Sequence, residues 1–193
     1  MNTLLPYVYS DFVGRLTKPG GDILEALDAK KTNVLHMAVG YIGETSELLA
    51  CLVREEIDRE NLIEELGDLA FYRTGMYLAL GWMPPTSRPW ESRHLSPVDG
   101  CHNLIYGAGA LLDAAKKMAI YNAPWFNEKD PSKNLEPLFR SALLALEEDT
   151  CRLYVGLSVT EHEVLLANET KLMARYKKVT YSDAAASERA DKA

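Results

Sequence analysis

Apolar residues recur along most of this chain at spacings of three and four, and sustained alternation of apolar and polar positions is missing. This period is typical of amphipathic helices. We therefore expect an all-α protein whose core resembles a four-helix bundle, preceded by extra N-terminal helices at about 7–16 and from about 22 onward. The longer helices are expected at about 32–55, 59–80, 101–121, 135–155 and 160–178.

Breaks in this pattern indicate how the chain is organised. Residues 82–100 hold four prolines and few periodic apolar positions, so a crossover loop is expected there. Residues 181–193 have almost nothing to bury and are expected to form a mobile tail. Residues 1–180 are long enough for one sizeable core and are expected to form a single domain. A weak echo between 48–81 and 111–156 leaves open an internal repeat.

Composition narrows the range of partners. Lys and Arg number 21 against 28 Asp and Glu, and the net charge of −7 argues against a nucleic-acid-binding surface, which needs a basic patch. No apolar run reaches the ~18 residues of a membrane span, and the first residues do not read as a signal peptide. Cys51, Cys101 and Cys151 lack the spacing of zinc or redox motifs, which favours buried thiols in a reducing compartment. We expect a cytoplasmic protein that binds neither nucleic acid nor membrane.

Two acidic pairs are the most informative polar feature. Glu44 and Glu47 lie in one predicted helix, and Glu65 and Asp68 lie in the next. A spacing of three puts both members of a pair on one helix face, so two facing helices would aim four carboxylates at one point. Glutamates on a helix usually face solvent, but these pairs lie among apolar residues, where like charges raise each other's pKa unless a cation binds them. The pattern predicts a site for a hard divalent cation such as magnesium.

Glycines inside predicted helices indicate close packing. Gly43 and Gly67 lie in the helices that carry the acidic pairs, where each costs about 1 kcal/mol relative to alanine. Close approach of these two helices is one physical reason to accept that cost. Gly107 and Gly109 form only a fragment of a dinucleotide-binding motif, without a third glycine or a preceding strand, and tight helix packing is the preferred interpretation.

Polar residues on the last long helix supply complementary chemistry. Asn168, Lys171 and Arg175 are three and four residues apart and therefore share one stripe. Their amide, ammonium and guanidinium groups could bind phosphate oxygens, with Arg175 the better bidentate contact. Lys116 and Lys117 are adjacent, so only one of them can face the acidic groove, and Lys116 is our choice.

Two other functional classes fit parts of this pattern. A di-iron protein also builds a carboxylate site in a helical bundle, but it needs two Glu-x-x-His motifs on core helices. The chain has one, from Glu91 to His94 in the predicted loop, and His102 and His162 lack the spacing. The other class is a non-catalytic helical module that binds nucleotides or partner proteins on the same scaffold. Retention of all four acidic positions argues against this module, which stays as the alternative.

Four motifs, taken in order, carry a resemblance to a known family. They are HMAVGYIGETSELL, ENLIEELGDLAFY, LLDAAKKMAIYN and GLSVTEHEVLLANETKLMARY, which together span most of residues 32–178. The chain resembles the MazG-like, all-alpha nucleoside-triphosphate pyrophosphohydrolases, particularly longer members of the kind found in phages. The specific part of the match is the paired acidic motif combined with the Asn, Lys and Arg-Tyr positions of the last helix.

The resemblance implies a reaction. A ribo- or deoxyribonucleoside triphosphate, with dGTP or GTP the first to consider, would be cleaved between the α and β phosphates into a monophosphate and pyrophosphate. Glu47 is our choice for the residue that takes the proton from the attacking water. A homodimer or homotetramer is implied, in the host cytoplasm if the protein is phage-encoded. Magnesium, for which manganese can substitute, would be held by Glu44, Glu47, Glu65 and Asp68.

The resemblance also assigns roles around these acidic positions. His36 and Tyr176 match positions of the family pattern, and each has two interpretations, core packing or contact with the base. The residues implied to position the phosphates for in-line attack are Lys116, Asn168, Lys171 and Arg175.

The chain departs from the family after its first acidic pair. Many members have an acidic residue and then lysines there, whereas this chain has Ala50, Cys51 and Val53. Arg54 is the only nearby cation. The sequence therefore does not show which residue makes the phosphate contact that is usual at this place, and Lys116 or Lys117 could supply it instead.

Overall fold

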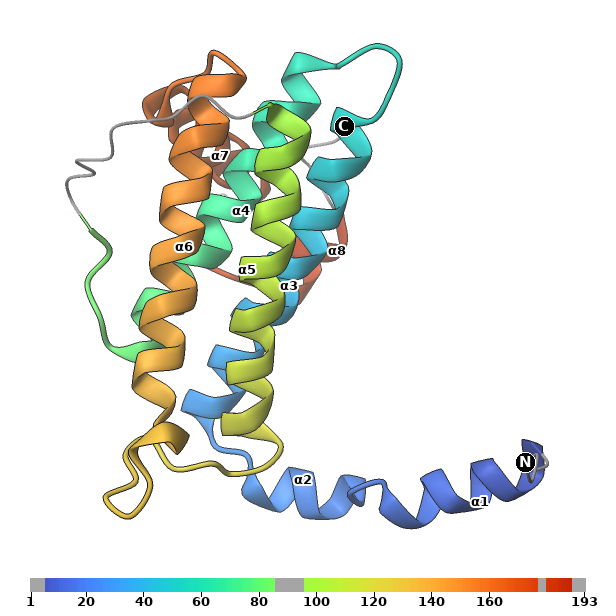
Figure 1. Cartoon of the computed structure of the whole chain (residues 1–193). Helices are drawn as coiled ribbons and strands as arrows, with labels where there is room; N and C mark the ends of the chain where they lie inside the picture. Colours follow the sequence, from blue (N-terminus) through green and yellow to red (C-terminus); the bar gives the residue numbers. More distant parts are fainter. Residues whose placement is uncertain (1–5, 86–95, 177–179, 189–193) are drawn as a thin grey trace.

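The computed structural model describes residues 6–85, 96–176 and 180–188 of the chain. All regular secondary structure in these ranges is helical, which confirms the all-α prediction (Figure 1). A short 3-10 turn, η1 (Pro131–Lys133), precedes α6. The α-helices are α1 (Pro6–Leu16), α2 (Gly20–Ala26), α3 (Ala29–Leu52), α4 (Arg59–Leu80), α5 (Pro97–Ala119), α6 (Leu135–Gly156), α7 (Glu161–Arg175) and α8 (Asp183–Glu188).

Four long helices form the core, as the spacing of apolar residues predicts. α3 packs against both α4 and α5, α5 packs against α6, and their buried side chains form one hydrophobic cluster. α7 packs against α4. Figure 1 shows α1 and α2 extending away from the bundle as extra N-terminal helices. No helix in the described ranges combines the length and the hydropathy that crossing a bilayer requires.

Capping residues explain where the helices of the candidate site begin and end. Asp28 accepts a hydrogen bond from the backbone N–H of Lys31, so α3 begins earlier than the expected residue 32. Asp58 caps the first turn of α4 in the same way. α4 ends before Gly81, whose φ of 76° lies in the left-handed region that glycine adopts easily. The predicted bounds of α4 are therefore confirmed.

α5 begins inside the segment that was predicted to be a crossover loop. Ser96 caps this helix, and Pro97 occupies a first-turn position, where the missing N–H of proline has no helical partner to lose. The sequence prediction treated Pro97 as a loop residue and was wrong for 97–100. The loop prediction for 86–95, with its single Glu-x-x-His motif, lies outside the described residues.

Part of the C-terminal segment, which was predicted to be a mobile tail with almost nothing to bury, forms a short helix in which no residue is buried. Asp183–Glu188 form α8, which contacts α7. Tyr181 and Ala186 from this segment line the cavity described below. Residues 189–193 lie outside the described ranges.

A buried ion pair joins α4 to α6 inside the bundle. Arg73 Nε lies 2.9 Å from Glu147 Oε1, and both side chains are only 3% exposed. Arg73 also donates a hydrogen bond of 2.9 Å to Thr150 Oγ1, and Thr150 donates to the carbonyl of Leu146 at 2.6 Å. The neighbouring Tyr41 is fully buried, and burial raises its pKa to about 12. These polar groups fix how α4 is rotated relative to α6.

α5 and α6 approach each other closely at Gly107. A Cβ atom at this position would lie 2.6 Å from Leu146 Cδ2, closer than packed carbon atoms come. A Cβ atom added at Gly109 would have no neighbouring atom within 4 Å. The prediction of tight helix packing is thus confirmed at Gly107 and wrong at Gly109.

Breaking the Arg73–Glu147 pair should destabilise the fold. Glu147→Gln leaves the Arg73 charge buried without its counter-charge, and we expect a loss of about 3–5 kcal/mol in the free energy of unfolding, measured by urea denaturation. The matched control is Glu136→Gln on the same helix, whose pair with Arg140 is exposed at 41% and 61%. This control should cost no more than about 1 kcal/mol. Similar losses for the two variants would contradict a stabilising role of the buried pair.

Candidate functional site

A cavity of about 1000 Å³ lies where α3, α4 and α7 meet. Segment 180–188 and Arg54, two residues past the end of α3, add to its lining. The structure thus brings residues from distant parts of the chain, including most of those singled out by sequence, to one place. The charged lining residues are six acidic ones, Glu44, Glu47, Glu64, Glu65, Asp68 and Glu169, and two basic ones, Arg54 and Arg175.

Three of the predicted acidic residues form a cluster at this cavity. Glu44 and Glu47 lie one helical turn apart on α3, and Glu65 approaches them from α4. One carboxylate oxygen from each of the three lies within 4.8 Å of the other two. The apolar neighbours Leu48 and Leu66 are buried in the core, and this burial orients the acidic faces of the two helices toward each other.

The clustered carboxylates repel one another. The pKa of Glu44 is raised from 4.5 to about 7, first by burial and then by the negative charges of Asp68, Glu47 and Glu65. The pKa of Glu65 is also raised, by burial and then by Glu47 and Asp68. Glu47 is the most accessible member, with its residue exposed and the other two partly or fully buried. A bound cation would relieve this repulsion.

Asp68, the fourth predicted ligand, makes different contacts. Lys171 Nζ lies 2.5 Å from both of its carboxylate oxygens, and Asn168 Nδ2 donates to Oδ1 at 2.8 Å. Lys171 also lies 3.4 Å from Glu64 Oε1. The sequence predicted that all four carboxylates converge, with Lys171 and Asn168 on phosphate. In the structure three carboxylates converge, while the fourth is held by α7, because an ammonium and an amide are the nearest donors to it.

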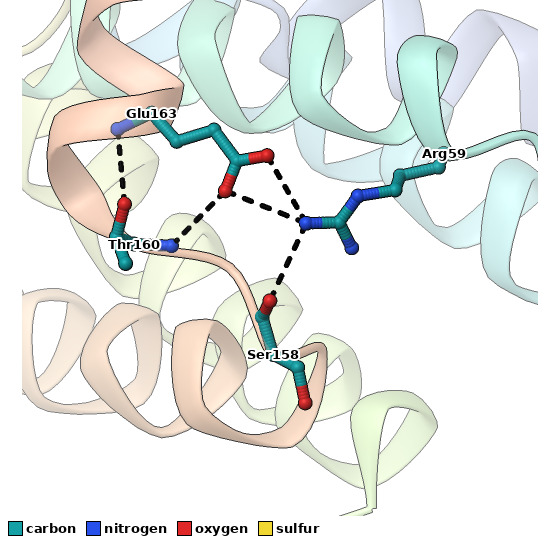
Figure 2. A network of polar contacts seen from close by, with 4 residues as sticks. All are labelled: Arg59, Ser158, Thr160 and Glu163. Carbon is teal, nitrogen blue, oxygen red and sulfur yellow. Dashed lines mark hydrogen bonds and ion pairs between the residues drawn. The ribbon is translucent and has the colours of Figure 1, made fainter.

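Contacts at the start and near the middle of α7 hold it against α4. At the start of α7, Arg59 Nη2 lies 3.0 Å from Glu163 Oε1 and donates to the carbonyl of Ser158, and Thr160 and Glu163 form a capping box (Figure 2). Farther along α7, Asn168 packs on Gly67, where a Cβ would lie 2.8 Å from Asn168 Cβ. The cavity wall formed by α7 is therefore fixed at more than one point.

The predicted role of the two glycines needs correction. Gly43 has nothing within 4 Å of a test Cβ, so it does not mark a close approach of α3 and α4. Gly67 does mark a close approach, but with α7 rather than α3. The tight contact between α3 and α4 occurs at Gly40, where a Cβ would overlap the ring of Tyr72. Sequence spacing showed where helices carry glycine, but not which neighbour the glycine faces.

The predicted cations divide into two groups. Arg175 lines the cavity, and so does Arg54, which the sequence left without an assigned role. Lys116, in the last turn of α5, does not line it; its Nζ lies 5.5 Å from the centre of the ring of Tyr121, just past the end of that helix. Lys117 pairs with Asp113 at 2.7 Å. The structure does not bring either lysine to the carboxylates.

Aromatic side chains line another part of the same cavity. His36 and Tyr72 lie edge to face with ring centres 6.1 Å apart, and Phe71 lies 5.3 Å from Tyr72. Tyr176 lies 5.8 Å from Tyr181. The pKa of Tyr72 is raised by burial and then by the negative charges of Glu44 and Asp68.

Sequence reasoning named His36 and Tyr176 but missed Tyr72 and Tyr181. Tyr72 follows Asp68 by four residues, so the same helical spacing that linked the acidic pair would have placed it on that face. Tyr181 carried no such signal, because it lies in the segment predicted to be a tail.

The cluster has the donor chemistry of a magnesium or manganese site. Its ligand atoms are carboxylate oxygens alone, which hard cations prefer, whereas zinc and iron sites commonly include histidine or cysteine. Burial and the neighbouring negative charges raise the pKa of Glu44 and of Glu65, so a divalent cation fits the electrostatics as well. In the described residues, the cluster with metal-ligand spacing is the one formed by Glu44, Glu47 and Glu65.

Comparison with known proteins does not identify a family. No protein-family model, no curated protein and no solved structure matches this chain. A functional assignment therefore depends on the geometry of the cavity and on the motifs within the chain.

The raised pKa of Glu44 predicts an unusual pH dependence of stability. Its pKa is about 7 in the folded protein, against an ordinary value of 4.5 in an unfolded chain, so the folded state binds more protons between these values. The stability that Glu44 contributes is therefore full below pH 4.5 and is lost as pH rises toward 7. Glu44→Gln should raise Tm at pH 8, without divalent cations, by about 2 °C in thermal denaturation.

Magnesium should reverse the order of the Tm values of the unmodified protein and Glu44→Gln. Adding the ion at pH 8 should raise the Tm of the unmodified protein and have a much smaller effect on Glu44→Gln, because binding to the folded state stabilises it. Glu60→Gln, an exposed change in the first turn of α4, is the control and should respond to magnesium like the unmodified protein. If Glu44→Gln had a lower Tm than the unmodified protein at pH 8 without magnesium, this result would contradict repulsion between Glu44 and the neighbouring carboxylates.

Proposed function

We propose that this protein hydrolyses nucleoside triphosphates between the α and β phosphates, as its resemblance to MazG-like pyrophosphohydrolases implies. The observation that carries the proposal is the cluster of Glu44, Glu47 and Glu65, with Asp68 beside it, at a cavity of about 1000 Å³. A cavity of this volume is at the upper end of the range for pockets that enclose a whole small ligand. Six acidic against two basic lining residues would repel a polyphosphate unless divalent cations accompany it.

The carboxylates would hold magnesium or manganese, and such an ion neutralises phosphate charge and lowers the pKa of a bound water. Glu47 is the exposed member of the cluster, so its carboxylate is accessible to accept the proton from the attacking water. Lys171 and Asn168 fix the Asp68 carboxylate from the side of α7. These residues together give the acidic end of the cavity a defined arrangement before substrate enters.

Two arginines are the cations best placed to contact phosphate. Arg54 and Arg175 both line the cavity, and a guanidinium can donate two parallel hydrogen bonds to one phosphate. Under this proposal Arg54 takes the role that lysines have in many family members, and Lys116 has no part in binding. Lys171 acts through Asp68 as a positioning residue.

The donor set separates this proposal from the di-iron alternative, because the clustered ligand atoms include no histidine nitrogen among the described residues. The non-catalytic module would use the same cavity for binding alone. It differs from the proposal in one property that can be measured, which is turnover.

We expect magnesium-dependent release of pyrophosphate from at least one nucleoside triphosphate. The full chain is incubated with ribo- and deoxyribonucleoside triphosphates, beginning with dGTP and GTP, and the products are separated by chromatography. Monophosphate plus pyrophosphate supports the proposal. Diphosphate plus phosphate would place the cleavage elsewhere, and absence of turnover with every nucleotide would favour the binding module.

Glu47→Gln should abolish turnover, with a loss of at least about 100-fold, because the amide can neither accept the proton nor bind the cation with the same charge. Its helical content, measured by circular dichroism, should be unchanged, since Glu47 is exposed and outside the core. Glu55→Gln, an exposed change just after α3, is the matched control and should retain activity. An active Glu47→Gln protein would remove this residue from the mechanism.

A further inference from the structure

The acidic cluster and the two arginines account for one part of the cavity, and its aromatic part has no role in that chemistry. Rings from three separate segments meet there: His36 on α3, Tyr72 on α4, and Tyr176 with Tyr181 at the end of the chain. Aromatic side chains that line one cavity together offer flat apolar faces, and tyrosine and histidine add polar groups at the ring edges. This combination suits a planar ligand with hydrogen-bonding groups on its edge.

Tyr181 is the residue in this group that the core does not require. Its residue is 69% exposed, although it lines the cavity and its ring centre lies 5.8 Å from that of Tyr176. Its hydroxyl donates a hydrogen bond of 2.8 Å to Asp183 Oδ1 at the start of α8, which orients the ring. An oriented but exposed ring gains contacts when a flat ligand covers it.

We propose that Tyr181, from the segment 180–188, forms part of the wall of a subsite for a planar heteroaromatic ring. The subsite deepens the proposed function, on which it rests, because a nucleoside triphosphate carries such a ring at the opposite end from its terminal phosphates. The acidic cluster would then engage the phosphate chain, and Tyr181 with Tyr176 would stack on the base. The C-terminal segment therefore takes part in selecting the substrate.

The geometry within the cavity supports this division. Tyr72 lies one helical turn after Asp68 on α4, and its ring packs on His36, so Tyr72 marks the border between the acidic and the aromatic parts. Tyr176 follows Arg175 directly, so a phosphate-binding guanidinium and a stacking ring leave the same end of α7. A ligand that spans both parts would contact phosphate-binding and base-binding groups at once.

Binding measurements on the full chain test the proposal. The probes are α,β-methylene analogues of nucleoside triphosphates, which resist cleavage, and inorganic tripolyphosphate, which has phosphates but no ring, each with magnesium. Tyr181→Ala should weaken binding of the analogues by about tenfold and change tripolyphosphate binding by less than about twofold, because only the stacked ring is lost. Tyr181→Phe should bind the analogues nearly as well as the unmodified protein. Tyr106→Ala, on α5 and outside the cavity, is the control and should change neither affinity.

The subsite would be overturned if Tyr181→Ala lost equal affinity for the analogues and for tripolyphosphate, or lost no affinity for either. The same holds if the unmodified protein binds no analogue more tightly than tripolyphosphate. These results are distinct from failure of the proposed reaction, since the analogues are not cleaved. If the unmodified protein releases pyrophosphate but Tyr181→Ala binds the analogues with unchanged affinity, the subsite alone is overturned. If Tyr181→Ala selectively weakens analogue binding but the unmodified protein turns over no nucleotide, the reaction alone is overturned.

Discussion

Repulsion among carboxylates held in a partly buried cavity is the constraint on which the rest of this structure depends. Burial, followed by the negative charges of the neighbouring carboxylates, raises the pKa of Glu44 to about 7, a cost that the folded chain carries on its own. Groups with strongly shifted pKa values tend to gather at functional sites, because stability alone would separate them. The fold tolerates the cluster because α3 and α4 also bury a large apolar face, and because α7 brings Lys171 to Asp68, so that one negative charge at the cavity has a counter-charge.

α4 contributes residues both to the acidic cavity and to the buried ion pair. One side of it carries Glu65 and Asp68 toward the cavity, and another side carries Arg73 into the buried pair with Glu147 on α6. The pair is costly to desolvate, so its contribution is more to the orientation of α4 than to net stability. Rotation of α4 would separate Arg73 from Glu147 and also move the carboxylates away from α3. The buried pair and the acidic cluster are thus two consequences of one helix orientation.

The helical fold and the placing of each acidic pair on one helix face could be predicted from sequence because both depend on spacing within a single helix. Periodic apolar residues gave the bounds of α4, and a spacing of three put Glu44 beside Glu47. The Arg73–Glu147 pair could not be predicted, since charged residues are normally solvated and the pair joins helices far apart in the chain. The pairing of Lys171 with Asp68 was missed for a related reason: spacing shows which face a side chain shares, but not which of two partners it contacts.

The division of cations follows from their chemistry. An ammonium is a compact point charge that can approach both oxygens of one carboxylate, as Lys171 does with Asp68 at 2.5 Å. A guanidinium is planar and suits the paired oxygens of a phosphate, and the lining of this cavity provides two of them, on Arg54 and Arg175. Under the proposed function, the lysine thus acts within the protein and the arginines act on the ligand. This assignment explains how the chain could act on a polyphosphate although it lacks the lysines that many MazG-like proteins have after the first acidic pair. It also explains why Lys116, which lies over Tyr121 instead, is not needed there.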